Sequence, residues 1–520
     1  MNLANILADA AQLHGGRIAL TDLDDPGGRR EMTYDELWQQ VQRTAQALRD
    51  MGILPGERVA MLLGNSWEYV QTFLAIASAG MVAVPMNTRL LEDELLHIVR
   101  DSGARLLVAH GELLQARPKL LGAAPLGEVV ARTVTALGSC QRAFDDFPAA
   151  QGAMQPQVVS GEALASINYT SGTTGLPKGA MLPHRAWRSV SQYTCELLGF
   201  AADEVTIHTA ALTHGSGFLM LPTMEVGGRA LLCAKFDPPR VLQLLTDEQV
   251  TSGFFVPSMI QMLLDAHADG TPLLGLPFRA MYYAGSPIDP STLRGALATF
   301  GDVLVQSFAQ TEIPMFLTSM GRDQHRLING NKPHLIRAAG RVVPGVRLRV
   351  VDDEGYEVTA GEAGEVVAQG PHMMLGYWNR PDATAETIVD GWLHTGDVGR
   401  FDEEGYLYIV DRKKDMIISG GSNVYAREVE EALLKLRGIK EVAVIGLPHP
   451  KWGEMVTAVM VAQEEPLTEQ DLETFCRQEI ADYRRPKKYL WTQSLPRNAY
   501  GKVLKRQLRD QYSNLAKESP

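Results

Sequence analysis

Apolar positions in the N-terminal part of the chain switch between helical spacing and short unbroken runs. Residues 32–52 carry apolar side chains three and four positions apart and stop at Gly52, which predicts an amphipathic helix. The apolar run 58–63 follows, a second helical stretch leads to Gly80, and the run 81–85 comes next. Short apolar runs between helices are typical of strands that helices cover on both faces. This alternation predicts an α/β architecture with a buried, mostly parallel sheet.

The pattern continues through the middle of the chain and then changes. A helical stretch at 241–250 is followed by apolar runs at 251–257 and 278–285, as in the N-terminal part. Beyond residue 340, three segments are broken by glycine turns and are typical of antiparallel strands: 345–358, 364–370 and 405–412.

The last part of the chain alternates helices and strands of its own. Its helical stretches and apolar runs are 427–438, 441–448, 454–463, 471–480 and 487–493. That set is enough for a small α+β domain. The charged stretch 410–416 is unsuited to a core and predicts a joint before this domain. We therefore expect an N-terminal domain at 1–411 and a C-terminal domain at 412–520, with a hinge in 411–415.

Composition and charge narrow the class of protein. The 520 residues are 45% hydrophobic and 21% charged, which is typical of a globular chain with more than one domain. A net charge of −12 argues against a nucleic-acid binder, because phosphate backbones attract basic surfaces. The sequence has no unbroken apolar run long enough to span a membrane. Residues 1–16 predict a short amphipathic helix rather than a signal peptide, so we expect a cytoplasmic protein.

The cysteines do not predict a metal site. Cys140, Cys195, Cys233 and Cys476 lie far apart and match no metal-ligand spacing. We expect them to be free thiols in a reducing compartment.

The segment YTSGTTGLPKG at 169–179 has the composition of a phosphate-binding loop. Its glycines allow the positive φ angles that point successive N–H groups at an anion, and its hydroxyls and Lys178 add donors and charge. It is not an ordinary P-loop, because Pro177 stands where the second glycine belongs and Gly179 stands where a Ser or Thr would bind Mg²⁺. A flexible glycine–serine linker is the alternative interpretation, and the apolar strand directly before the loop argues against it.

This loop resembles the signature of the adenylate-forming superfamily, which includes acyl-CoA synthetases, non-ribosomal peptide adenylation domains and beetle luciferases. Further segments resemble that family's motifs in the family's order: 307–312, 364–384, 392–397, 411–430 and 496–502. The resemblance covers essentially the whole chain. It implies a fold with a large N-terminal domain of parallel-rich layered α/β subdomains and a β-barrel-like subdomain, followed by a small mobile α+β C-terminal domain. It also implies that ATP activates a carboxylic acid as acyl-AMP with release of pyrophosphate.

The resemblance assigns roles to residues at the nucleotide. Lys502 would bridge the substrate carboxylate and the α-phosphate, Glu312 and Thr174 would hold Mg²⁺, and Lys178 would contact phosphate. The ATP- and AMP-binding residues implied in this way are Thr170, Ser171, Gly172, Thr173, Thr174, Gly175, Lys178, Gly285, Ser286, Pro287, Phe308, Ala309, Gln310, Thr311, Asp397 and Arg412. The chain departs from the family motif at two positions, because Phe308 replaces a tyrosine and Ala309 replaces a glycine. The added methyl of Ala309 should narrow the acyl site locally.

The implied acyl site is uncharged. Its expected members are His214, Gly215, Phe254 or Phe255, Ala284, Ser307, Ala309 and Met315. His214 is expected to line the site or to gate the thiol tunnel, with an ordinary core histidine as the alternative. Residues 205–224 hold no Asp for an amino-acid ammonium group, and no Arg or Lys stands among these positions for a second carboxylate. We therefore expect an apolar acid, either aryl or medium- to long-chain, and not a malonate-type acid.

The second half-reaction needs an acceptor thiol. By resemblance, Gly420 and Gly421 would line a tunnel for pantetheine, and Lys414 would be the hinge about which the small domain rotates. The residues expected to grip the CoA nucleotide are Trp452, Tyr483, Arg485 and Lys487, for which a surface basic cluster is the alternative.

These observations favour an ATP-dependent carboxylate:CoA ligase that uses ATP, Mg²⁺ and coenzyme A. A stand-alone adenylating enzyme that loads the phosphopantetheine of a carrier protein is the main alternative. A luciferase-type oxygenase also stays open. A non-catalytic ATP-binding module is disfavoured because the implied catalytic residues are present. The oligomeric state is open, with a homodimer as one option.

Overall fold

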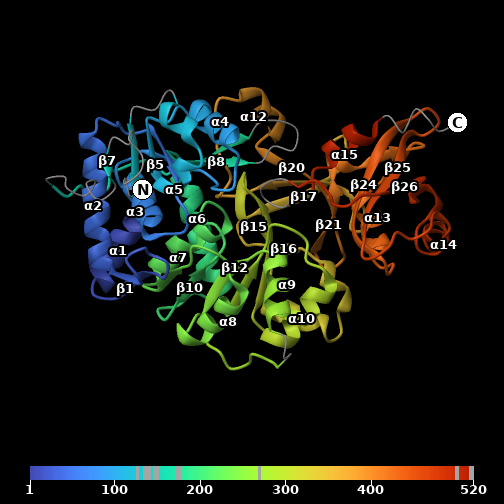
Figure 1. Ribbon diagram of the computed structural model, residues 1–520, viewed down its shortest axis with the longest axis horizontal. Coiled ribbons are helices and arrows are strands. Elements are labelled where there is room, and N and C mark those ends of the chain that lie inside the picture. The colour runs from blue at the N-terminus through green and yellow to red at the C-terminus, as the bar shows by residue number, and fades with distance from the viewer. Residues whose placement is uncertain are drawn as a thin grey trace. The chain divides into compact units, whose positions relative to one another are not determined.

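The computed structural model describes residues 1–123, 128–132, 142–143, 152–170, 177–267, 271–497 and 503–513 (Figure 1). The chain forms two compact units. The large unit takes its described residues from Met1–Ser171, Leu176–Leu348 and Ala368–Leu393. The small unit takes its described residues from Arg349–Val367 and His394–Pro520. This division does not test the predicted hinge at Lys414, which stays a prediction.

The first sheet of the large unit has seven strands in the order β7-β6-β5-β3-β4-β8-β9. All neighbouring strands are parallel except β8 and β9, which are antiparallel. The strands are β3 (Arg58–Leu62), β4 (Val82–Pro85), β5 (Leu106–His110), β6 (Glu128–Arg132), β7 (Arg142–Ala143), β8 (Leu164–Thr170) and β9 (Lys178–Pro183). Helix α2 (Tyr34–Asp50) precedes β3, and the helical segments between the strands are α3 (Trp67–Ser78), α4 (Glu92–Ser102), α5 (Gly111–Gln115) and η1 (Pro118–Gly122).

The second sheet of the large unit runs in the order β16-β15-β14-β13-β12-β10-β11-β1-β2. Strands β14, β13, β12, β10, β11 and β1 are parallel neighbours, and β2, β15 and β16 are antiparallel additions at the ends. The strands are β1 (Ile18–Asp22), β2 (Arg30–Thr33), β10 (Val205–His208), β11 (Arg229–Leu232), β12 (Ser252–Phe255), β13 (Ala280–Tyr283), β14 (Leu304–Gln310), β15 (Ile313–Met320) and β16 (Gly340–Val342).

Helices α8, α9 and α10 lie side by side next to this second sheet (Figure 1). Each begins with a proline in its first turn, and Asp237 and Asp289 cap α8 and α10, which is favourable chemistry for a helix start. The helical segments of the unit not yet given are α1 (Asn5–His14), α6 (His184–Leu198), η3 (Gly215–Leu219), α7 (Met220–Glu225), α8 (Pro238–Asp247), α9 (Pro257–Ala266), α10 (Pro290–Phe300), α11 (Arg322–Ile328), η4 (Pro333–Arg337) and α12 (Pro381–Thr387). Helix α1 confirms the predicted N-terminal helix.

Helices α2 and α3 show how local sequence sets local structure. Helix α2 starts at a capping box formed by Thr33 and Glu36, and Gly52 follows its end with a φ of 80°. Every residue of α3 is buried, as expected for a helix whose sequence is mostly apolar, and the buried residues include the polar Glu68, Gln71, Thr72 and Ser78. Its Phe73 packs on Trp187 of α6, with ring centroids 4.9 Å apart, inside one continuous apolar core.

The small unit contains two groups of strands. The first follows the path β17-β18-β20-β21, built from β17 (Arg347–Val351), β18 (Gly364–Gln369), β20 (Trp392–Phe401) and β21 (Tyr406–Arg412). The short strand β19 (Ile388–Val389) belongs to the large unit and pairs with Trp392 and Leu393 at the start of β20. The expected barrel-like subdomain corresponds to these strands, which do not close into a barrel within the part of the chain that the structure describes.

The second group is a sheet of five strands, β23-β22-β25-β24 with β26 beside β25. Residues along β24 and β25 alternate between two apolar clusters, so both faces of this sheet are buried. Helices α13 and α14 contribute to one cluster and α15 to the other. The elements are η5 (Lys413–Asp415), β22 (Ile417–Ser419), β23 (Ser422–Val424), α13 (Ala426–Leu433), β24 (Ile439–His449), β25 (Gly453–Ala462), α14 (Glu469–Glu479), η6 (Asp482–Arg484), β26 (Lys488–Trp491) and α15 (Lys505–Tyr512).

The predicted fold class, α/β with a large N-terminal and a smaller C-terminal part, is confirmed. Among the described residues, no helix is both long and apolar enough to cross a membrane. Cys195, Cys233 and Cys476 are free thiols, as expected, while Cys140 lies outside the described residues. Within the same described ranges, no group of His, Cys, Asp and Glu side chains is arranged to hold a metal ion.

Candidate active site

The predicted acyl and adenine residues lie along one edge of the second sheet. Strands β10, β12, β13 and β14 are adjacent and parallel, so their carboxyl ends share that edge. His214 follows β10, Gly285 follows β13, and Thr311 and Glu312 follow β14. Ligands of open α/β sheets bind outside the carboxyl ends of the strands. The sheet order therefore brings these distant segments together at the edge where a site is expected.

Five side chains or glycines form an uncharged group that we call the acyl-site cluster: Gly215, Phe254, Tyr282, Ser307 and Met315. A Cβ on Gly215 would lie 2.5 Å from the Phe254 ring, so glycine is needed for this close approach. The Phe254 ring meets Tyr282 with centroids 5.4 Å apart. The Tyr282 hydroxyl lies 2.5 Å from Ser307 Oγ and donates to the Met315 carbonyl at 3.1 Å. Three predicted acyl residues thus meet around Tyr282, and a fourth, Gly215, packs against one of them, Phe254.

The structure separates two residues that sequence analysis had left as alternatives. Phe254 faces Gly215 and Tyr282, whereas Phe255 packs on Phe278 with ring centroids 6.4 Å apart. Successive residues of a strand point to opposite faces, so only one of the two can belong to the cluster. Phe255 therefore lies outside the acyl-site cluster.

Two features of the cluster were not predicted. Tyr282 is fully buried, and burial raises its pKa, so its hydroxyl stays a neutral donor. A usable signal was present in the sequence, because Tyr282 lies two residues before the predicted Ala284, the spacing that places side chains on one face of an extended chain. Met315 adopts a φ of 71°, a left-handed conformation that is rare for a residue with a side chain. Such strained residues concentrate at functional sites.

His214 sits at the start of η3 with a half-buried side chain. Its Nδ1 lies 2.9 Å from Thr213 Oγ1. Burial lowers the pKa of His214 to about 4, and the positive charge of Arg89 lowers it further. The imidazole is therefore neutral at physiological pH and can donate or accept one hydrogen bond.

The phosphate-loop region gathers a lysine, a tyrosine and a glutamate. Thr170 ends β8 and pairs across the strands with Lys178, the first residue of β9. Lys178 Nζ lies 5.1 Å from the centroid of the Tyr377 ring, and the Tyr377 hydroxyl donates to Glu312 Oε1 at 2.7 Å. Burial and the charge of Glu312 raise the pKa of Tyr377. Sequence analysis did not assign Tyr377, although it stands in the matched motif at 364–384.

The remaining nucleotide residues of the large unit lie in loops and at a bulge. Gly285 adopts a φ of 90°, and it is exposed together with Ser286 and Pro287. The register of β14 against β15 shifts between Phe308 and Gln310, so Ala309 lies at a β-bulge. Phe308, Ala309, Gln310 and Thr311 are half-buried. Six predicted residues lie outside the described residues: Ser171, Gly172, Thr173, Thr174, Gly175 and Lys502.

Within the small unit, the predicted ribose-binding residues are direct neighbours. Asp397 of β20 and Arg412 of β21 are cross-strand partners, and Arg412 Nε lies 2.6 Å from Asp397 Oδ1. The Asp397 backbone N–H donates to Thr395 Oγ1 at 3.0 Å, and this bond helps to hold the backbone of Asp397 in place. Asp397 is only 3% exposed, so the arginine offsets the cost of burying its charge.

The predicted hinge lies among charged residues of the same unit. Lys414 is an exposed residue of η5. On one side of it, Lys413 pairs with Glu365 at 3.1 Å, and on the other, Asp415 pairs with Arg509 at 3.1 Å.

The predicted CoA residues fall into two groups near the β22–β23 turn. Gly420 and Gly421 form the turn with φ angles of 60° and 80°, and the Gly420 N–H donates to the Trp452 carbonyl at 2.8 Å. Trp452 stacks on His449 with centroids 4.3 Å apart. The second group, Tyr483, Arg485 and Lys487, lies at η6, which contacts β23. Tyr483 is 45% exposed, and burial together with the charge of Arg485 lowers the pKa of Lys487.

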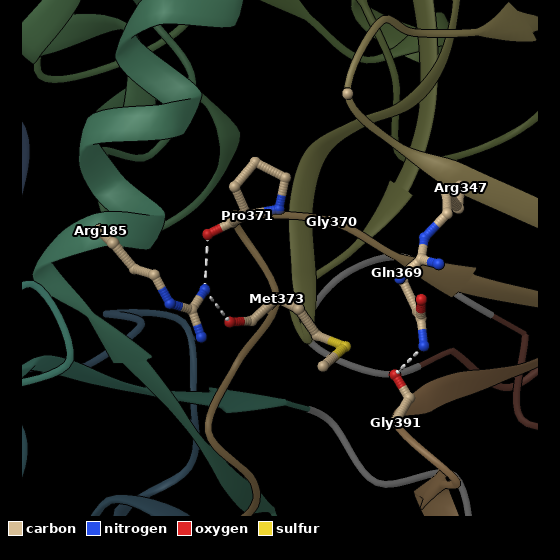
Figure 2. Close-up of a pocket in the computed structure, with 8 residues that line it drawn as sticks. Arg185, Arg347, Gln369, Gly370, Pro371, Met373 and Gly391 are labelled. Atoms are coloured by element: carbon tan, nitrogen blue, oxygen red, sulfur yellow. Dashed lines mark hydrogen bonds between the residues drawn. The ribbon is translucent and has the colours of Figure 1, made fainter.

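A surface cavity of about 410 Å³ lies elsewhere on the large unit (Figure 2). It contains none of the predicted site residues, and its lining includes Arg185, Arg347 and Gln369. Arg185 already donates to the carbonyls of Pro371 and Met373, and it also pairs with Glu162 at 2.7 Å. Because these carbonyls and this carboxylate already engage the guanidinium, it has a structural role, and we assign no ligand to this cavity.

Comparisons with known proteins agree with the geometry. The chain matches the AMP-binding enzyme family over residues 7–378 and the AMP-binding enzyme C-terminal domain over residues 428–502. It is 37% identical to a feruloyl-CoA synthase of an Amycolatopsis species, over 93% of this chain and 95% of that one. It is 35% identical to the fatty acid–[acyl-carrier-protein] ligase ScoC of Streptomyces coeruleorubidus, over 93% and 92%. It is 34% identical to the long-chain-fatty-acid–CoA ligase FadD13 of Mycobacterium tuberculosis, over 94% and 95%.

Solved structures give the same result. ATP-bound MatB from Rhodopseudomonas palustris superimposes with a TM-score of 0.86 at 31% identity, covering 99% of this chain and 100% of that one. The o-succinylbenzoate CoA synthetase MenE of Bacillus subtilis, in complex with its acyl-adenylate intermediate, gives a TM-score of 0.85 at 28% identity, covering 97% and 98%. The resemblance noted in the sequence is confirmed, and the chain belongs to the AMP-binding enzyme family.

Proposed function

We propose that this chain is an AMP-forming carboxylate:CoA ligase acting on an apolar acid, either aryl or medium- to long-chain. The observation that carries the proposal is the acyl-site cluster, whose five members are uncharged and come from the adjacent strands β12, β13, β14 and β15 and from the start of η3. Relatives named as feruloyl-CoA and long-chain-fatty-acid–CoA ligases support both the reaction and an apolar acyl group.

ATP binds, on this proposal, across the loops beside the cluster. Lys178 and the hydroxyls of Thr170, Ser171, Thr173 and Thr174 hold the phosphates that leave as pyrophosphate. Glu312 and Thr174 would hold Mg²⁺, and the half-buried Glu312 carboxylate beside Tyr377 offers the oxygen ligands that this ion prefers. When bound, the ion neutralises phosphate charge.

The small unit contains the residues proposed to bind the ribose and the lysine proposed to stabilise charge during adenylation. Asp397 accepts from the ribose hydroxyls, and Arg412 supports that carboxylate. Lys502 offsets the repulsion between the substrate carboxylate and the α-phosphate as the carboxylate oxygen attacks phosphorus and pyrophosphate leaves. The product is an acyl-AMP mixed anhydride.

Thioester formation follows at the same carbonyl. The CoA thiol attacks it, AMP leaves, and the thiol proton passes to solvent or to a phosphate oxygen. Gly420 and Gly421 line the pantetheine path, and Trp452, Tyr483, Arg485 and Lys487 bind the CoA nucleotide. Lys414 is the hinge between the two half-reactions. We also propose a cytoplasmic location, where both ATP and CoA are supplied.

A carrier-protein phosphopantetheine is the second candidate acceptor. The relative ScoC, a fatty acid–[acyl-carrier-protein] ligase with 35% identity, favours it. The first half-reaction is the same for both acceptors, so only the thiol donor distinguishes them.

The test is a panel of aryl and aliphatic carboxylic acids incubated with ATP, Mg²⁺ and either CoA or a holo carrier protein. We expect a CoA thioester, detected by mass spectrometry, from at least one aryl or long-chain acid. Thioester on the carrier protein alone would favour the second candidate, and no acyl-AMP from any acid would refute both. Light scattering would decide between monomer and homodimer.

Two variants separate the half-reactions. Lys502→Ala should abolish acyl-AMP formation but still convert supplied acyl-AMP to thioester. Gly421→Val should release pyrophosphate but form little thioester. Equal loss of both steps in either variant would contradict its assigned role.

A further inference from the structure

The Asn65 side chain holds four backbone groups at the edge where the acyl site lies. Its Nδ2 donates to the carbonyls of His208 at 3.1 Å, Ala210 at 2.9 Å and Cys233 at 3.1 Å. Its Oδ1 accepts from the Leu212 N–H at 2.9 Å. The residue is only 8% exposed. One amide therefore ties together the carboxyl ends of β10 and β11.

Asn65 reaches these strands from the other sheet of the large unit. It lies between β3 and α3, directly before Ser66, whose side chain caps α3 by accepting from the Tyr69 N–H. Its backbone is therefore fixed by a strand on one side and a buried helix on the other. The side chain is a rigid link between the carboxyl edges of the two sheets.

The segment that Asn65 holds, residues 209–217, is anchored at further points. The Tyr69 hydroxyl donates to the Leu212 carbonyl at 3.0 Å. His208 Nδ1 lies 3.0 Å from Ser216 Oγ. A Cβ on Gly217 would lie 1.9 Å from the Leu212 carbonyl oxygen, so the segment folds tightly on itself. Such a segment moves as one piece, and its position depends on these anchors.

This segment carries His214 and Gly215, and Gly215 packs against the Phe254 ring. We propose that Asn65 is a positioning residue that sets the distance of the 209–217 segment from Phe254 and so determines which acids the site accepts. The inference rests on the proposed function, because it takes the acyl-site cluster as the place where the acid binds. The four bonding partners of Asn65 are not among the residues assigned to ATP, so its effect should fall on acid binding and not on the nucleotide.

A matched control exists in the same unit. Asn2 is 3% exposed, donates to the carbonyls of Ala77 at 2.7 Å and Gln157 at 3.1 Å, and accepts from the Ala4 N–H at 3.0 Å. It bridges backbone segments as Asn65 does, but none of its three partners belongs to the 209–217 segment. Asn2→Ala therefore measures the cost of losing a buried amide without moving the acyl site.

The experiment compares Asn65→Ala, Asn2→Ala and the unchanged protein. For each, KM for ATP, KM for the preferred acid, and kcat/KM for that acid and a bulkier one are measured by pyrophosphate release. We expect Asn65→Ala to raise the KM for the acid by about tenfold, which is the discrimination that one methylene group provides in an apolar pocket. The KM for ATP should stay within about twofold of its value in the unchanged protein. The preference between the two acids should shrink. Asn2→Ala should lower Tm without changing that preference.

Tyr69→Phe keeps the experiment decisive if Asn65→Ala does not fold. It removes only the bond to the Leu212 carbonyl and should raise the acid KM by about two- to fivefold, as expected for one hydrogen bond. An unchanged acid preference in the folded variants, or equal rises in the KM for acid and ATP, would overturn the inference alone. Absence of acyl-AMP from any acid with the unchanged protein would instead overturn the proposed function, and this inference with it.

Discussion

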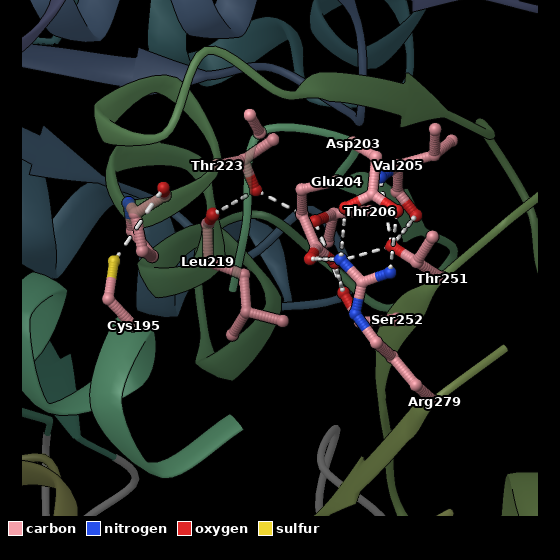
Figure 3. A network of polar contacts seen from close by, with 12 residues as sticks. Cys195, Asp203, Glu204, Val205, Thr206, Leu219, Thr223, Thr251, Ser252 and Arg279 are labelled. Atoms are coloured by element: carbon pink, nitrogen blue, oxygen red, sulfur yellow. Dashed lines mark hydrogen bonds and ion pairs between the residues drawn. The ribbon is translucent and has the colours of Figure 1, made fainter. Parts of the chain in front are cut away.

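Buried polar groups at the two ends of strands β10, β12 and β13 differ in how fully they are hydrogen-bonded. At the amino ends, the buried carboxylate of Glu204 uses both of its oxygens (Figure 3). Oε1 accepts from Thr251 Oγ1 at 2.6 Å and from Ser252 Oγ at 2.5 Å, and Oε2 accepts from Arg279 at 2.7 Å. A buried charge with a cation and two hydroxyls around it is well satisfied.

At the carboxyl ends of the same strands, some buried polar groups lack hydrogen-bond partners. His208 Nε2 and Thr209 Oγ1 are buried and have no hydrogen-bond partner within the described part of the chain. Met315 holds a positive φ nearby, and Gly215 leaves no room for a side chain. Local strain and unpaired polar groups lower stability and are kept where a ligand is to be bound. The amino end of the sheet therefore has the features of a structural network, and the carboxyl end has the features expected of a binding site.

Removing the cation that pairs with Glu204 at the amino ends of the strands should have the largest effect on stability. Arg279→Met leaves Glu204 buried without a cation and should lower the free energy of unfolding by about 3–5 kcal/mol. Urea unfolding would measure it, and the acid KM of the folded protein should not change. The control Arg326→Met removes an exposed arginine that pairs with Asp302 and Asp323, and should leave the free energy of unfolding nearly unchanged, because solvent screens exposed ion pairs. Similar losses in the two variants would contradict the comparison.

A substitution at the carboxyl edge of the sheet should lower activity and leave stability unchanged, the reverse of the result expected for Arg279→Met. Glu312→Gln keeps an oxygen that can accept from Tyr377 but removes the charge, so acyl-AMP formation should fall by about 10–100-fold, as when a metal site is perturbed. The free energy of unfolding should not fall. Pyrophosphate release across a Mg²⁺ titration measures the first effect, and urea unfolding measures the second. Unchanged activity would remove Glu312 from the site.

A smaller effect is expected where the acyl-site cluster is packed most tightly. Gly215→Ala places a methyl 2.5 Å from the Phe254 ring, so kcat/KM for a bulky acid should fall by about tenfold while a small acid is affected less. Gly16→Ala is the control, because a Cβ there meets no atom within 4 Å. Equal losses for small and bulky acids would show that Gly215 does not shape the acid's binding space.

Local patterns in the sequence predicted the elements better than the contacts between them. The helix expected at 32–52 is observed as Tyr34–Asp50, because apolar spacing and a capping box at Thr33 act within a few residues. The order of the strands in the second sheet is non-local, and it decides which residues meet. The contact of Gly215 with Phe254 and the pair of Glu204 with Arg279 each join positions dozens of residues apart.

The same limit explains the site residues that sequence analysis missed. Asn65 and Tyr377 act through partners that lie far away in the chain. The choice between Phe254 and Phe255 depended on which face of β12 meets η3, which no local pattern specifies. Family motifs supplied the positions that are predicted to bind the nucleotide, and packing supplied the residues that hold some of those positions in place.

The smallest expected effect concerns how the activity and the stability depend on pH through His214, which lies near the carboxyl end of β10. Burial lowers the pKa of His214 to about 4, below the ordinary value near 6.5, so the imidazole is neutral throughout the range of the assay. His214→Gln should therefore reduce kcat/KM for the acid without changing the shape of its dependence on pH between about 5 and 8. The lowered pKa also means that the unfolded chain binds the proton first, so the contribution of His214 to stability is present above about 6.5 and is lost as the pH falls toward 4. The unfolding free energy of the unchanged protein should fall more steeply than that of His214→Gln between pH 7 and pH 5. An inflection near pH 6.5 in kcat/KM that disappears in His214→Gln would mean that this histidine titrates in the site, and the carboxyl end would then hold a charge that its burial argues against.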